Sequence, residues 1–74
     1  MKTANEISVD TAGMVAAFES CKGLTVAVEM WAGRRFSALV LGVTGDNGRR
    51  THVRLDGGDT FEVRVADVAT IEVL

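Results

Sequence analysis

The sequence predicts a mainly β protein, with one N-terminal helix followed by a five-stranded, strongly bent antiparallel barrel. Past Gly23, apolar residues recur at every second position in five short runs, which is typical of strands with one buried face. The runs are joined by only a few residues, whereas parallel strands need crossovers of about a dozen residues or more. Because an open meander leaves two exposed edges, we expect the sheet to curl closed.

One short helix is predicted over residues 11–22. Its apolar side chains share a stripe at helical spacing: Met14, Val15, Phe18 and Cys21. Asp10 or Thr11 can accept hydrogen bonds from the first free N–H groups of the helix. Gly23 is expected to end the helix in a left-handed conformation.

The first two predicted strands flank the segment "WAGR". The inward residues of the first are Leu24, Val26, Val28 and Met30, and those of the second are Phe36, Ala38 and Val40. Leu39, Leu41 and Val43 are assigned to the other face of the second strand, so its end is apolar on both sides. We therefore expect this strand either to be covered by the helix or to be bent by a bulge near Gly42.

The last three strands follow two turn signals, "DNG" at 46–48 and "DGGD" at 56–59. The residues predicted to point inward are Val53 and Leu55, then Phe61, Val63 and Val65, and finally Ile71 and Val73. His52 and Arg54 are predicted to point outward.

The chain has 74 residues, which predicts a single domain over 10–74 preceded by a flexible arm at 1–9. A domain of this size buries only about 60% of the surface of its unfolded chain, so it would gain from self-association. The net charge of −2 argues against a uniformly basic nucleic-acid surface. No apolar run is long enough for a signal peptide or a membrane span, and Cys21 has no partner for an intrachain disulfide. These observations favour a cytoplasmic location.

The segment "GRRFSALV" at 33–40 resembles the first motif of the Sm-like proteins, a subclass of the SH3-like barrels. The resemblance covers most of 11–74 as a pattern of strands, with Ala38 where that family usually has glycine. Sm proteins that bind uridine-rich RNA carry a stacking residue and an asparagine after the second strand, and an Arg-Gly pair near the fourth. Here Asp46-Asn47 has no stacking residue beside it, and Val65-Ala66-Asp67 replaces Arg-Gly.

The layout also resembles the Rho-binding antiterminator family, whose Sm-like barrel lacks the RNA pocket. Its last strands are similar to "FEVRVADVATIEV" at 61–73. This resemblance implies a regulator that contacts the RNA-binding site of another protein.

Two arginine pairs are the first candidate site: Arg34 with Arg35, and Arg49 with Arg50. If the two loops met, the four side chains could bind phosphate. In a meander, consecutive hairpins lie at opposite ends of the sheet. We therefore favour the interpretation that these are solvated charges at the hairpin ends.

Trp31 is the one tryptophan and is assigned to the face opposite the inward stripe. It could anchor a partner or stack on a base, or it could pack under the helix or cover the barrel mouth. Leu39, Leu41 and Leu74 share this ambiguity. His52 and Arg54 complete the candidate binding residues. A metal site at His52 would need further Cys, His or carboxylate ligands, and the one other soft donor, Cys21, belongs to the apolar stripe of the helix.

The predicted function is a non-catalytic binding or regulatory module that acts through protein–protein contacts as a homo-oligomer. An RNA-binding Sm-like ring is the alternative. We predict that the protein is not an enzyme, because no nucleophile, base or metal constellation can be assembled, and Asp56 and Asp59 flank glycines as ordinary turn residues. No cofactor, metal, membrane or small-molecule substrate is expected.

Overall fold

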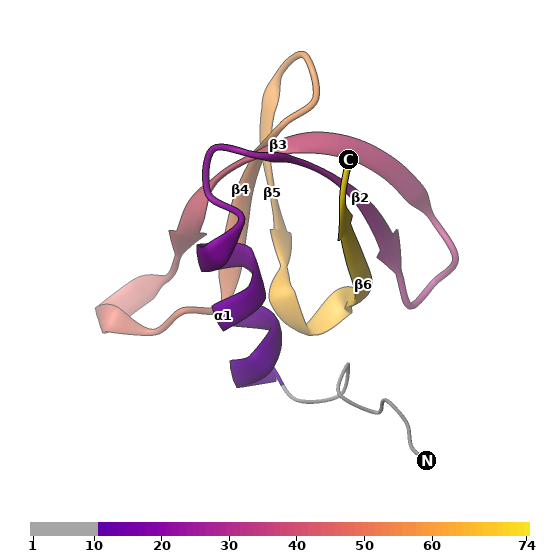
Figure 1. Ribbon diagram of the computed structural model, residues 1–74. Helices are drawn as coiled ribbons and strands as arrows, with labels where there is room; N and C mark the ends of the chain where they lie inside the picture. The colour runs from indigo at the N-terminus through magenta and orange to yellow at the C-terminus, as the bar shows by residue number, and fades with distance from the viewer. Residues whose placement is uncertain (1–10) are drawn as a thin grey trace.

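The computed structural model describes residues 11–74, so the predicted arm at 1–9 lies outside the described residues. The elements in chain order are α1 (Thr11–Ser20), β2 (Thr25–Met30), β3 (Arg35–Thr44), the 3₁₀ turn η1 (Asp46–Gly48), β4 (His52–Asp56), β5 (Thr60–Arg64), the 3₁₀ turn η2 (Val65–Asp67) and β6 (Val68–Val73). Figure 1 shows the helix against a curved sheet. The prediction of a mainly β chain with one N-terminal helix and five antiparallel strands is confirmed.

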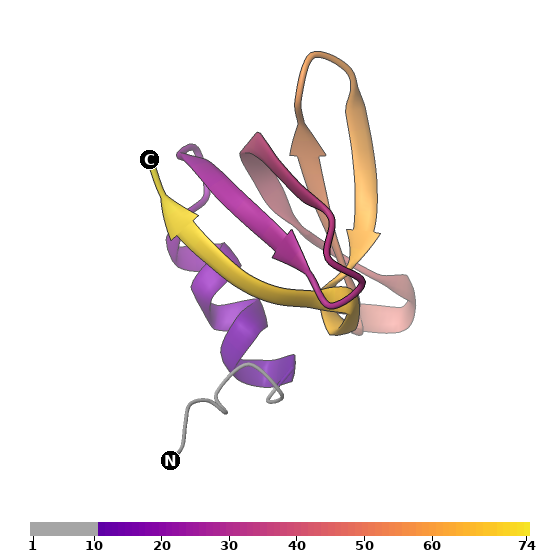
Figure 2. The ribbon, with the colours of Figure 1, turned by 90° about the vertical axis from the view of Figure 1, so that its right-hand side faces the viewer.

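The five strands form one antiparallel sheet in the order β5-β4-β3-β2-β6. Strands β2 to β5 make a meander, and β6 returns to pair with β2 rather than with β5. Figure 2 shows β6 and β5 on opposite flanks of the sheet, with the other strands between them. Within residues 11–74 no pairing joins β5 to β6, so the sheet is not closed and the predicted barrel is not confirmed.

Helix α1 covers the middle of the sheet with the apolar stripe that the sequence predicts. Met14, Val15 and Phe18 are buried, and the helix packs against β3 and η2. The helix ends at Ser20, two residues before the predicted end, and a turn follows in which Gly23 has a φ of +85°. The left-handed stop at Gly23 is therefore confirmed. In the described part of the chain, no helix is long and apolar enough to cross a membrane.

The core lies between α1 and the inner face of the sheet. Alternation holds in the central strands, where the fully buried side chains are Val26, Val28, Val40, Val53 and Leu55. Each such side chain contributes about 1.5–3 kcal/mol when it is removed from water. The predicted inward positions of β2, β3 and β4 are confirmed at these residues.

A bulge in β3 changes which face its last residues occupy. The β3–β4 register shifts between Val40 and Gly42, and Val43 then stands opposite Val53 and packs against the core. The predicted bulge near Gly42 is confirmed. The assignment of Val43 to the outer face is wrong, because the extra residue in the bulge reverses the alternation after it.

The ends and edges of the sheet are less buried than the alternation predicts. Leu24 precedes β2 and is 45% exposed, so its assignment to the buried stripe is wrong. Phe61 and Val73 stand opposite the inward residues Leu55 and Val26, yet they are 37% and 52% exposed. They lie on edge strands, which have a neighbouring strand on one side only.

The β3–β4 connection confirms the turn signal at residues 46–48. Asn47 has a φ of +55°, a left-handed conformation that asparagine tolerates better than most residues. The chain passes so close to Gly45 that a Cβ atom there would overlap the carbonyl oxygen of Arg49. Glycine at position 45 is therefore required by space in this loop.

Candidate functional site

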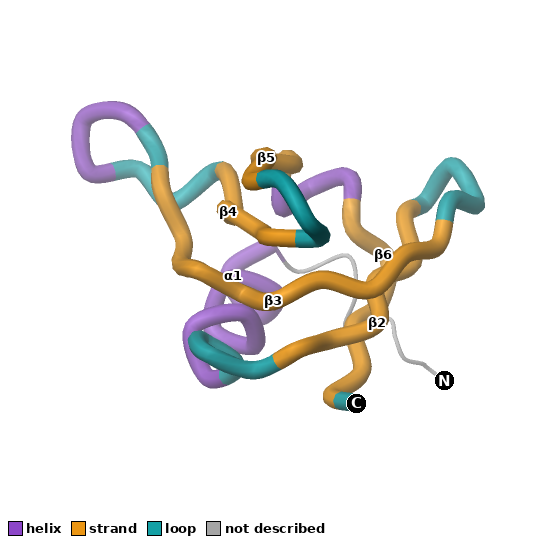
Figure 3. The backbone as a smooth tube through the Cα atoms, turned by 90° about the horizontal axis from the view of Figure 1, so that it is seen from above, coloured by secondary structure: helices purple, strands orange, loops and turns teal. Residues whose placement is uncertain are grey.

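The two arginine pairs lie at opposite ends of β3. Arg34 and Arg35 stand where the β2–β3 turn enters the strand, and Arg49 and Arg50 follow η1 beyond its other end. Figures 1 and 3 show the β2–β3 turn and the η1 loop at the two ends of the molecule. The expected separation of the pairs is confirmed, so one chain does not gather the four side chains into a single basic patch.

One arginine of each pair is joined to a carboxylate. Arg35 Nη2 lies 3.5 Å from Glu29 Oε2 on the neighbouring strand, and Arg50 Nη1 lies 3.0 Å from Glu19 Oε2 on α1. Both pairs are largely exposed, so each contributes at most about 1 kcal/mol to stability. Their larger effect is on the surface potential, because each carboxylate offsets the charge of its arginine.

The outward arginines of β4 and β5 are also paired. Arg54 Nε lies 3.9 Å from Glu62 Oε2 across the two strands, as the register predicts, and Arg64 Nε lies 3.6 Å from Asp67 Oδ2 in η2. The outward position that the sequence predicts for Arg54 is confirmed. Four of the six arginines thus have an acidic neighbour, which weakens the attraction of these side chains for a phosphate backbone.

Arg34 and Arg49 have no carboxylate within ion-pair distance among residues 11–74. The guanidinium carbon of Arg34 lies 5.9 Å from the centre of the Phe36 ring, within the range of a cation–π contact. Phe36 in turn meets Phe61 edge to face, with ring centres 5.6 Å apart. Arg49 is exposed in the η1 loop.

Trp31 stands in the β2–β3 turn rather than within a strand, and it is 55% exposed. Its backbone N–H donates to the carbonyl oxygen of Asp67 at 2.9 Å, which fixes the turn against η2. The alternative in which Trp31 packs under the helix is wrong. An exposed tryptophan on an anchored turn is available to a partner, and tryptophan is enriched among the residues that dominate binding interfaces.

His52 is half-buried on the outer face of β4, where the sequence places it. Its Nδ1 lies in a hydrogen bond 2.8 Å from the hydroxyl oxygen of Thr51. Two open hollows of about 240 and 350 Å³ border the ring, one beside Glu62 and one beside Arg64. Among residues 11–74, no three His, Cys, Asp or Glu side chains gather as metal ligands would.

The carboxylate of Asp56 has a structural role in the turn before β5. Its Oδ1 accepts a hydrogen bond of 3.0 Å from the backbone N–H of Gly58. This bond is typical of aspartate in tight turns, so the turn interpretation of Asp56 is confirmed. The contact gives no support to a role of Asp56 in acid–base catalysis.

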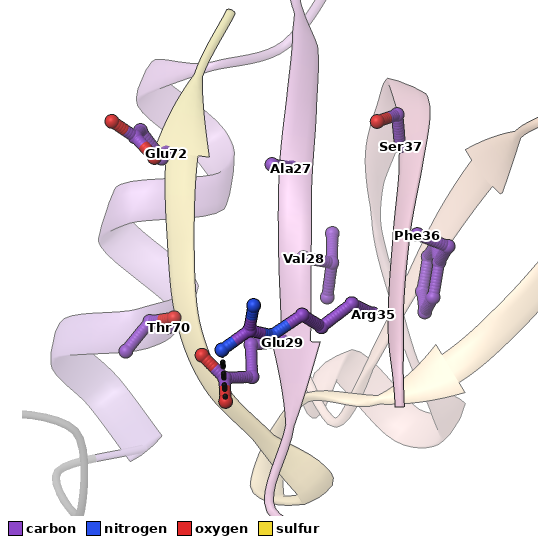
Figure 4. A pocket seen from close by; sticks show the side chains of 8 residues that line it. All are labelled: Ala27, Val28, Glu29, Arg35, Phe36, Ser37, Thr70 and Glu72. Carbon is purple, nitrogen blue, oxygen red and sulfur yellow. Dashed lines mark ion pairs between the residues drawn. The ribbon is translucent and has the colours of Figure 1, made fainter. Parts of the chain in front are cut away.

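A shallow hollow of about 510 Å³ on the outer face of β6, β2 and β3 was not predicted (Figure 4). Six of its eight lining residues form two rows across the strands: Glu72, Ala27 and Ser37 in one, and Thr70, Glu29 and Arg35 in the other. The hollow exists because Ala27 and Ser37 are small where outward residues are usually long. Those small outward residues are the signal in the sequence that could have revealed it. Glu29 is already paired with Arg35, and no pair of reactive groups faces the hollow.

No protein-family model, curated protein or solved structure matches this chain. The resemblances to the Sm-like and Rho-binding antiterminator families therefore stay predictions.

Proposed function

We propose that this chain is a non-catalytic binding or regulatory module that acts through protein–protein contacts and works as a homo-oligomer. The observation that carries the proposal is the open sheet, whose two edge strands expose apolar side chains on the inner face. Phe61 on β5 and Val73 on β6 are the clearest examples. Unpaired strand edges with adjacent apolar surface are templates for pairing with another chain.

We further propose that the sheet is a variant of the Sm-like barrel. The layout supports this: an N-terminal helix, a four-stranded meander, a short 3₁₀ turn, and a last strand that returns to the first. In this proposal the sheet stays open within one chain, and the edge strands β5 and β6 are the surfaces available for association.

The electrostatics favour a protein partner over RNA. The net charge is −2, the two arginine pairs lie at opposite ends of β3, and four arginines have acidic neighbours. Nucleic-acid affinity depends mainly on cations that neutralise phosphates, and few of these arginines are free to do so. An RNA-binding ring is the alternative, and affinity capture with and without nuclease distinguishes the two.

The β2–β3 turn is the proposed contact for a partner other than a second copy. It carries two exposed residues, Trp31 and Arg34, and tryptophan and arginine are among the residue types most enriched where binding energy concentrates. The bond from Trp31 N–H to Asp67 holds the turn in place, so little order has to be gained on binding.

The test has two measurements on the full chain. Sedimentation velocity over a range of concentrations should show a species larger than the monomer. Affinity capture from extract, with and without nuclease, should retain a protein partner after nuclease treatment, and Trp31→Ala should lose it. Capture that depends on nucleic acid and falls when Arg49 and Arg50 become alanine would instead support the RNA-binding ring. A chain that stays monomeric at all concentrations would contradict the homo-oligomer.

A further inference from the structure

Among residues 11–74, no strand pairs with the outer edge of β5, and this edge presents the backbone groups of the outward residues of the strand. Val65 N–H donates to the Thr51 carbonyl at 3.0 Å, and this bond continues the β4–β5 register. Since antiparallel hydrogen-bonded pairs alternate, Phe61 and Val63 bond toward β4. The N–H and C=O groups of Glu62 and Arg64 therefore point away from the sheet, while their side chains lie on its outer face.

On the outer edge of β6, the residues whose backbone groups point away from the sheet have their side chains on the inner face, the opposite of β5. Leu74 N–H donates to Thr25 at 3.0 Å, so the alternation turns the backbone groups of Ile71 and Val73 outward from the edge. These two side chains lie on the inner, apolar face. Side chains of an antiparallel hydrogen-bonded pair share one face. Pairing β5 with β6 of another copy would thus put Glu62 and Arg64 on the face of Ile71 and Val73.

Pairing of β5 with β5 of a second copy keeps the two faces continuous. In the register that places Val63 opposite Val63, Glu62 of each copy forms a hydrogen-bonded pair with Arg64 of the other. Opposite charges directly across strands stabilise a pair, whereas like charges destabilise it. The adjacent registers place Glu62 opposite Glu62, or Arg64 opposite Arg64. The charges therefore select one register.

The β5 edge lacks two features that prevent such pairing, a bulge and a proline. Four of its five residues are exposed, its register with β4 has no bulge, and the strand contains neither proline nor lysine. By contrast, the register of β6 with β2 is interrupted, and Glu72 is its one charged residue. A β6–β6 pair would gain no opposite charges.

We propose that the homo-oligomer is built on a two-fold dimer in which the β5 edges of two copies pair antiparallel about Val63. The joined sheet has ten strands, with Glu62 facing Arg64 of the second copy twice on the outer face. On the inner face, Val63 of one copy stands opposite Val63 of the other. This dimer rests on the self-association in the proposed function and specifies its surface.

Charge reversal tests the register. Glu62→Arg alone, or Arg64→Glu alone, turns both cross-strand pairs into like-charge pairs. Each single variant should raise the dissociation constant of the dimer, measured by sedimentation equilibrium, by about tenfold or more. An equimolar mixture of the two variants restores both opposite-charge pairs, so it should regain dimer at the wild-type affinity. Far-UV circular dichroism on each variant checks that the monomer is folded.

The matched control is Glu72→Arg, the same substitution on the β6 edge, which should leave the dissociation constant unchanged. A second measurement uses cysteine pairs in a Cys21→Ser background. Val63→Cys should form a disulfide-linked dimer under mild oxidation, because a non-hydrogen-bonded antiparallel pair brings its Cα atoms to about 4.5 Å. Val73→Cys on β6 should not.

The outcomes separate this inference from the function it rests on. A wild-type chain that is monomeric throughout overturns both the dimer and the proposed self-association. If the chain self-associates but neither single reversal weakens it, or if Glu72→Arg weakens it instead, the β5 dimer is wrong and self-association stands. Recovery in the mixture, together with the Val63→Cys crosslink, supports the β5 register.

Discussion

The centre of the sheet and its edges follow the same alternation in sequence but differ in burial. Val28 in β2 and Val40 in β3 are fully buried between two neighbouring strands, beneath α1. Phe61 in β5 and Val73 in β6 also occupy inward positions, yet both are exposed. Alternation therefore determines which face a side chain occupies, whereas the neighbouring elements determine whether that face is covered.

The largest expected difference in stability between the centre and the edge is at two phenylalanines. Phe18→Ala removes a fully buried ring between helix and sheet and should lower the free energy of unfolding by about 3–5 kcal/mol. Phe61→Ala, the same change at the edge, should cost only about 1–2 kcal/mol. Urea unfolding at a concentration that keeps the chain monomeric measures both. Equal losses would mean that the β5 edge is covered in solution within one chain.

Two glycines extend the comparison to the loops. Gly45→Ala should cost about 1–3 kcal/mol, because its Cβ would overlap the Arg49 carbonyl and the η1 loop must shift. Gly57→Ala, near the β5 edge, is the control: its Cβ would meet Phe61 and Ser37 at 3.5 Å, an ordinary contact. We expect Gly57→Ala to be neutral or to stabilise by about 0.4–1 kcal/mol. Thermal unfolding measures which variant loses more stability. A larger loss of stability for Gly57→Ala than for Gly45→Ala would contradict the prediction.

Trp31→Ala should change stability by less than about 1 kcal/mol, because more than half of the side chain already faces water. The tryptophan fluorescence of the wild-type monomer should be quenched readily by iodide, as for an exposed indole. Val28 lies in the strand just before the turn and is fully buried, so Val28→Ala should lower the free energy of unfolding by more than Trp31→Ala does. A large loss of stability for Trp31→Ala would show that the turn packs against another part of the chain.

The smallest expected effect concerns the contact between α1 and the η1 loop. A double-mutant cycle with Arg50→Ala and Glu19→Ala should give a coupling free energy of about 0.2–1 kcal/mol, which falls as salt is added. The matched control is the exposed pair of Arg35 with Glu29 on the strands, whose coupling free energy should fall in the same range. A coupling well above this range would mean that the helix position depends on this ion pair.

Much of the fold could be predicted because it depends on local patterns. The stripe of Met14 and Phe18 predicts the face of the helix, and the "DNG" signal predicts the turn at Asn47. The sequence indicates a bulge near Gly42 but not that Val43 would move to the inner face, because alternation is counted along an unbroken strand. The pairing of β6 with β2 involves residues far apart in the chain, which local patterns do not encode.

The candidate site was predictable to a similar degree. The short turn after Met30 sets the hairpin register and so brings Glu29 opposite Arg35. The ion pair of Arg50 with Glu19 joins residues 31 positions apart and depends on how the helix docks. The sequence does not determine the exposure of Trp31 either, because exposure depends on whether the helix or another strand reaches the turn.

The 3₁₀ turn η2 keeps the end of β5 close to the start of β6. It connects β5 to β6 with three residues, which span only about 6 Å at the rise of a 3₁₀ helix. Val65 and Val68, at this junction, are fully buried, whereas Phe61 and Val73, at the far ends of the same strands, are not. The two edge strands therefore share a buried junction at η2, and their apolar side chains are exposed only at the ends far from it.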